Sequence, residues 1–77
     1  MAALRETAGY KEAMKEFGAM AYFMGEDFKP EEHLEEIKSI VEETGVKSEA
    51  KREMIIQEVV TGLYEAIHYV LPERDTQ

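Results

Sequence analysis

Several residue types that small proteins use to stabilise themselves are missing or scarce in this sequence of 77 residues. It contains no cysteine, which excludes disulfide bonds and every thiolate metal site. Only two prolines and five glycines interrupt it, and tryptophan is absent. A chain of this length hides only about 60% of the surface that its unfolded form exposes, so its core is small. Because self-association is a common way to make up that shortfall, we expect it here.

Basic residues are scarce as well. Nine Lys and Arg residues stand against 17 Asp and Glu residues, which gives a formal net charge of −8. A protein of this charge repels phosphate backbones and anionic lipids, so direct binding of nucleic acid is not expected. No apolar run approaches the roughly 18 residues of a membrane span, and no basic region followed by a long apolar run resembles a signal peptide. We therefore expect a cytoplasmic protein without membrane contact.

Helical periodicity dominates the first third of the sequence. Apolar residues recur there at intervals of three and four, which places them on one face of a helix. They are Tyr10, Ala13, Met14, Phe17, Met20, Ala21 and Met24. The pattern predicts a helix over residues 2–24 with a blurred start, because Thr7 is able to cap a later start and Gly9 weakens the first turns. Gly25 is expected to end it.

A proline marks the start of a second, acidic helix, predicted over residues 30–44. Pro30 suits the first helical position because its missing N–H costs nothing there. Gly45 is expected to end the helix. The predicted buried stripe consists of Leu34, Ile37, Ile40 and Val41. His33 lies at the margin of this stripe and is expected to be half-buried.

The third predicted helix covers residues 48–71, with Ser48 as its N-cap and Pro72 blocking its continuation into a tail at 72–77. Its apolar residues are Ile55, Ile56, Val59, Val60, Leu63, Ile67, Val70 and Leu71. They occupy about half of the helix circumference, wider than an ordinary stripe, which indicates neighbours on two sides.

The sequence thus predicts one all-α domain over residues 1–77. Its architecture is a three-helix bundle in which two long helices flank a shorter acidic one, completed by self-association. Gly18 and Gly62 lie inside the long helices, where glycine costs about 1 kcal/mol relative to alanine. Close backbone approach would offset that cost. The two glycines are expected either to meet within one chain or to face a symmetry-related copy.

The segment Gly18–Gly25 contains six consecutive apolar residues. The second predicted helix is too short to cover both of the long helices. Either the protein's own core hides this segment, with Phe28 folding back over it, or a second copy or another protein covers it. Aromatic residues and Met are enriched at the cores of interfaces. The difference in helix length and the wide apolar arc of the third helix, rather than these residue types, lead us to favour a partner. The predicted partner-binding residues are Met20, Tyr22, Phe23, Met24 and Phe28.

Acidic residues concentrate on the second helix and just before it. The predicted acidic ridge consists of Glu31, Glu32, Glu35, Glu36, Glu42 and Glu43. It is interpreted either as a solvated outer face or as a ridge that docks against a basic surface. In the second case the protein is an alternative candidate for a phage-type inhibitor that mimics nucleic acid.

One short motif has a metal-binding precedent. Glu65 and His68, spaced as Glu-x-x-His, lie side by side on the third helix, and this motif resembles half of the metal-binding pattern of ferritin-like di-iron proteins. The resemblance implies, as an alternative, a dimeric di-metal carboxylate protein with these two ligands. The motif occurs once, and it falls opposite the predicted core face, so an exposed Glu and His pair is the simpler interpretation.

No nucleophile with its base and no Gly-rich phosphate loop is visible, so neither an enzyme nor a cofactor is predicted. We expect a small non-catalytic protein–protein interaction module that acts as an adaptor, a chaperone or an inhibitor. Its expected partners are a second copy of itself and a larger protein with a basic or apolar groove.

Overall fold

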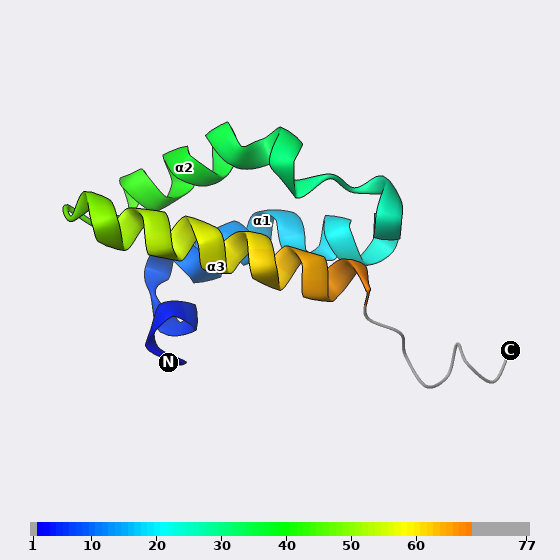
Figure 1. Cartoon of the computed structure of the whole chain (residues 1–77), viewed down its shortest axis with the longest axis horizontal. Coiled ribbons are helices and arrows are strands. Elements are labelled where there is room, and N and C mark those ends of the chain that lie inside the picture. Colours follow the sequence, from blue (N-terminus) through cyan, green and yellow to red (C-terminus); the bar gives the residue numbers. More distant parts are fainter. Residues whose placement is uncertain (1, 69–77) are drawn as a thin grey trace, which may run out of the picture.

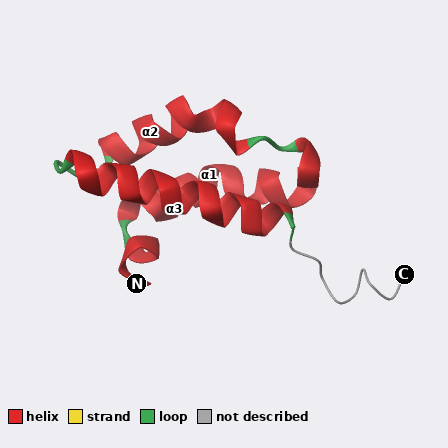
Figure 2. Cartoon of the chain, in the orientation of Figure 1, coloured by secondary structure: helices red, strands yellow, loops and turns green. Residues whose placement is uncertain are grey.

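The computed structural model describes residues 2–68, which fold into three α-helices and contain no strand (Figure 1). Helix α1 spans Ala8–Met24, α2 spans Leu34–Glu43 and α3 spans Glu49–Ile67. Helices α1 and α3 run in the same direction, and α2 lies against both with the opposite direction (Figures 1 and 2). The predicted all-α three-helix bundle is therefore confirmed for this part of the chain.

The first predicted helix is divided in two. Ala2–Glu6 form a short 3₁₀ helix, and α1 begins only after Thr7. The Thr7 side chain accepts a hydrogen bond of 3.3 Å from the Tyr10 backbone N–H, so it caps the helix. Helix α1 thus adopts the later start that Thr7 was predicted to allow. The prediction of one continuous helix from residue 2 is wrong.

Glycines end the first two helices as predicted. Gly25, with φ of 60°, follows α1, and Gly45, with φ of 87°, follows α2. Both conformations strain any residue with a Cβ atom, which explains why glycine occupies these positions. Pro30 begins a 3₁₀ turn, Pro30–His33, that leads into α2.

Helix α3 starts as expected, because the Ser48 hydroxyl accepts a hydrogen bond of 3.2 Å from the Lys51 N–H. His68 caps its end. The predicted extension through Val70 and Leu71, and the tail at 72–77, lie outside the described residues. No helix within 2–68 combines the length and the apolar character needed to cross a bilayer.

The core lies where the three helices meet and takes side chains from each of them. Its buried apolar residues are Tyr10, Ala13, Phe17, Ala21, Phe28, Ile37, Val41, Ile55, Val59, Leu63 and Ile67. The prediction that Leu34 belongs to this core is wrong, because 38% of its surface is exposed. The buried side chains of Phe28 and Pro30 fill the core at this end of α2 and leave Leu34 outside it.

The predicted difference in helix length is present. Helices α1 and α3 contain 17 and 19 residues, against 10 in α2, so α2 is shorter by about 10 Å or more. At Phe17, α1 already contacts the segment before α2, through the rings of Phe28 and His33.

The two glycines inside the long helices do not meet. A Cβ atom added at Gly62 would lie 2.5 Å from the hydroxyl oxygen of Tyr10, whereas one at Gly18 would meet only the Met14 methyl, at 3.6 Å. The alternative in which the two glycines meet within one chain is therefore wrong, and the alternative in which they face a second copy stays a prediction. Gly62 instead makes room for an aromatic ring of α1, because Tyr10 lies over the α3 backbone.

Candidate functional site

A groove runs between α1 and α2 on the surface of the bundle. It consists of two adjoining hollows of about 450 Å³ and about 370 Å³, which share Glu16 and Ile40. The other residues that line the larger hollow are Phe17, Glu35, Glu36 and Ser39. Those that line the smaller one are Glu12, Glu43 and Thr44. We refer to these nine residues as the α1–α2 groove.

The groove combines an apolar centre with acidic sides. Ile40 is half-buried and contributes apolar surface between the helices, whereas Phe17 is buried and belongs to the core. The glutamates of the groove are all exposed: Glu12, Glu16, Glu35, Glu36 and Glu43. Its lining contains no Lys or Arg, so the potential inside it is negative. His33 lies beside the groove, because its Nδ1 is 2.8 Å from a carboxylate oxygen of Glu36.

The α1 side of the groove continues into an exposed apolar surface. Successive positions four residues apart on a helix share one face, so Met20 and Met24 follow Glu12 and Glu16 along α1. Met20 is 40% exposed, Met24 is 45% exposed, and Phe23 beside them is 78% exposed. We refer to Met20, Phe23 and Met24 as the apolar end of α1.

The predicted partner-binding residues are thus divided by the structure. The three residues of the apolar end are exposed, and Tyr22 is half-buried with its ring edge-on to Phe23 at 5.1 Å between centroids. Phe28 is only 2% exposed, so its assignment to a partner surface is wrong. The turn that follows α1 brings Phe28 back into the core.

Phe28 is fixed in the core by aromatic contacts. Its ring stacks on that of His33, with centroids 5.0 Å apart and planes 8° from parallel, and lies 6.4 Å from the ring of Phe17. His33 also contacts Phe17, at 5.1 Å, and is half-buried as expected. These three rings join α1, the loop and the start of α2.

The six glutamates of the predicted acidic ridge are all exposed, but they do not share one face. Glu35, Glu36 and Glu43 line the α1–α2 groove. Glu31 faces α3 instead, where its carboxylate accepts a hydrogen bond from the Tyr64 hydroxyl. Glu32 and Glu42 line neither hollow of the groove.

Sequence reasoning missed Glu12 and Glu16 as members of an acidic groove lining. Their spacing of four from each other and from Met20 was a usable signal, because it aligns them with the apolar end of α1. Glu12 and Glu16 face Glu35 and Glu43 because of the way α2 packs against α1. The spacing of residues in the sequence does not predict this packing.

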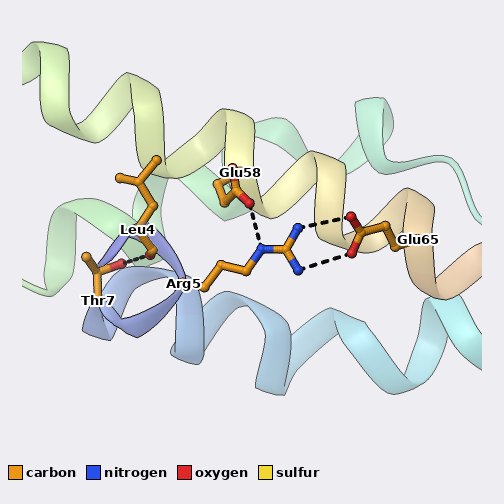
Figure 3. Close-up of polar contacts among 5 residues, drawn as sticks. All are labelled: Leu4, Arg5, Thr7, Glu58 and Glu65. Atoms are coloured by element: carbon orange, nitrogen blue, oxygen red, sulfur yellow. Dashed lines mark hydrogen bonds and ion pairs between the residues drawn. The ribbon is translucent and has the colours of Figure 1, made fainter. Parts of the chain in front are cut away.

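Glu65 is held by a basic residue and not by His68. Arg5 donates to both carboxylate oxygens of Glu65, at 3.1 and 3.0 Å, and its Nε donates to Glu58 at 2.6 Å (Figure 3). Arg5 thereby fastens the N-terminal 3₁₀ helix to α3. Both oxygens of the proposed metal ligand are engaged, and residues 2–68 contain no group of three His, Asp or Glu placed to hold a metal ion. The di-metal alternative requires a dimer and stays a prediction, and in it Glu65 would have to exchange Arg5 for a metal ion.

The ion pair of Arg5 and Glu65 ties the stability of the fold to pH. The hydrogen bonds from Arg5 hold the pKa of Glu65 below its ordinary value of 4.5, and the hydrogen bond from Tyr64 lowers the pKa of Glu31. Because these pKa values are lower in the folded state, the stabilisation is complete above about pH 4.5 and is lost as the pH falls through the folded values. Acid is therefore expected to lower the free energy of unfolding.

We expect Glu65→Gln to weaken this acid dependence, measured by urea unfolding between about pH 7 and about pH 3. Glu53→Gln, at an exposed position of the same helix, is the matched control and should keep the dependence of the unmodified protein. An acid dependence unaffected by Glu65→Gln would show that the ion pair does not form.

Comparison with protein-family models, with curated proteins and with solved structures finds no match to this chain.

Proposed function

We propose that this chain is a small non-catalytic protein–protein interaction module and that another protein binds along the α1–α2 groove and the apolar end of α1. The observation that carries the proposal is that exposed apolar side chains follow, further along the same helix, the glutamates that line the groove. Helix α1 contributes Glu12 and Glu16 to the groove and then Met20, Phe23 and Met24 beyond it. An adaptor, a chaperone or an inhibitor would each act through such a surface.

The chemistry of the surface supports a protein partner. Met and Phe are enriched at interface cores, and Met side chains adapt to partners of different shape. The glutamates around the apolar surface would speed association with a basic protein and fix its orientation. Self-association stays a prediction, and it would bring together two copies that each carry a net charge of −8. This repulsion favours a different protein as the occupant of the groove.

Photocrosslinking in the native host tests the proposal. A photoreactive amino acid is placed at Phe23, at Ser39 in the groove, or at Gln57, which is exposed on α3 and serves as the control. We expect the first two positions to yield the same adduct with another protein and Gln57 to yield none. The adducts are resolved by electrophoresis and assigned by mass spectrometry.

Each result bears on the proposal. Adducts at Phe23 and Ser39 no stronger than those at Gln57 would contradict a binding surface here. An adduct with the mass of two copies of this chain would make a second copy the partner, contrary to the charge argument. A protein joined to both positions but not to the control would support the proposal.

A further inference from the structure

The bound partner must match a surface whose two ends differ in chemistry. The end of the groove near Glu12 and Glu43 is acidic on both sides, because α1 and α2 each contribute a carboxylate there. The opposite end, beyond the start of α2, presents the three apolar side chains of Met20, Phe23 and Met24. One partner segment that covers both ends therefore needs positive charge at one end and apolar surface at the other.

The dimensions of the surface suit a single short helix. From Glu12 to Met24 the α1 wall extends over about 18 Å, which is the length of about 12 helical residues. The two hollows, of about 450 Å³ and about 370 Å³, are shallow and share Glu16 and Ile40, so a helix would lie along them on the surface of the bundle. A helix lying on such a surface buries apolar residues at i, i+3 or i+4 and i+7, and the half-buried Ile40, with Met20 further along, would receive them.

Charge complementarity predicts which residues the partner helix carries on either side of its apolar stripe. Glu16 on α1, with Glu35 and Glu36 on α2, would border the buried apolar stripe on its two sides. Lys or Arg on each flank of the partner stripe would lie next to these carboxylates, which are exposed and therefore available at low desolvation cost. A partner with acidic flanks would be repelled by the same residues.

We infer, on the basis of the proposed function, that the α1–α2 groove binds a basic amphipathic α-helix of a partner protein. The basic end of this helix lies between Glu12 and Glu43, and its apolar end lies on Met20, Phe23 and Met24. The specificity of the site comes from the requirement for both kinds of surface in one helix.

A synthetic peptide of about 14 residues tests the inference. Its first turns carry Lys on both flanks of a Leu stripe, and its last turn is apolar. We expect saturable binding in fluorescence anisotropy that weakens several-fold when NaCl is raised from about 50 mM to about 500 mM. A peptide of the same composition with the stripe scrambled should bind at least about tenfold more weakly.

Matched variants of the protein locate the binding site. Ser39→Arg places a bulky positive charge in the groove and is expected to weaken peptide binding at least about tenfold. Gln57→Arg makes the same change of charge on the exposed face of α3 and should alter binding by less than about twofold. Equal effects of the two substitutions would mean that the peptide responds only to net charge, and would overturn the inference.

The orientation of the peptide gives a second readout. A spin label on the apolar end of the peptide should broaden the amide signals of Phe23 and Met24, and a label on the basic end those of Glu12 and Thr44. The reverse pattern, or broadening spread evenly along α1, would overturn the inference.

If Phe23 and Ser39 crosslink to another protein in the host but the peptide does not bind, the proposed function stands and the helical partner is wrong. If neither the crosslinks nor peptide binding is observed, the proposed function and the helical partner are both wrong.

Discussion

Replacing Phe28 with alanine is expected to lower the free energy of unfolding by about 3 to 5 kcal/mol, the range measured for large core aromatic residues. Phe28 is only 2% exposed, and its ring contacts both His33 and Phe17. A domain of this size has a total stability of roughly 4 to 11 kcal/mol, so the substitution would remove a large part of it. Urea unfolding followed by far-UV circular dichroism measures the loss.

Phe23→Ala is the matched control, because it deletes the same side chain five residues earlier in the sequence. Phe23 is 78% exposed, so its removal should change stability by less than about 0.5 kcal/mol. Should Phe28→Ala fail to fold, Phe28→Leu provides a milder test, with an expected loss of about 1 to 2 kcal/mol. Similar small effects at both positions would contradict the placement of Phe28 in the core.

These two phenylalanines show why the candidate site was only partly predictable. Phe23 lies in an apolar stretch and Phe28 lies five residues later in the following loop, and the sequence prediction assigned both to a partner surface. What separates them is the turn after α1, where Gly25 takes a positive φ and the following 3₁₀ turn, Gly25–Asp27, reverses the chain. The path of this turn depends on the contacts of Phe28 with His33 and Phe17, which are tertiary.

Local signals predicted the capping residues of the helices, although α1 and α2 begin later than predicted, at Ala8 and Leu34. The hydroxyls of Thr7 and Ser48 act as N-caps, and Gly45 ends α2, because each role depends on a few neighbouring residues. The bonds of Arg5 to Glu58 and Glu65 span 53 and 60 residues of sequence, and no local pattern indicates them. The groove was missed for the same reason, since its acidic walls come from two helices.

Gly62→Ala tests the packing of Tyr10 against α3, because a single added methyl group is expected to lower the stability of the protein. Gly62→Ala would place its Cβ 2.5 Å from the Tyr10 hydroxyl oxygen and 3.3 Å from the ring carbon that bears it. Tyr10 is buried, so its rigid ring has little room to move. Overpacking of this kind costs about 1 to 3 kcal/mol, against a gain of about 1 kcal/mol in helix propensity. We expect a net loss of up to about 2 kcal/mol.

Gly18→Ala is the matched control in the other long helix. Its Cβ would meet only the Met14 methyl at an ordinary 3.6 Å, so helix propensity decides the outcome. We expect this substitution to stabilise the protein by up to about 1 kcal/mol. The two glycine substitutions should therefore shift the urea midpoint in opposite directions. A stabilising Gly62→Ala would show that Tyr10 does not lie over α3 as described.

A double-mutant cycle with Tyr10→Phe assigns the cost of Gly62→Ala to a particular atom. Removing the Tyr10 hydroxyl leaves the ring carbon at 3.3 Å as the nearest atom, a tight contact that small adjustments relieve. In the Tyr10→Phe background, Gly62→Ala should therefore cost at least about 1 kcal/mol less than in the unmodified protein. If the cost is the same in both backgrounds, the hydroxyl is not the source of the clash. Tyr10 and Gly62 would then contribute to stability independently, and the interlocking of α1 with α3 at this point would be wrong.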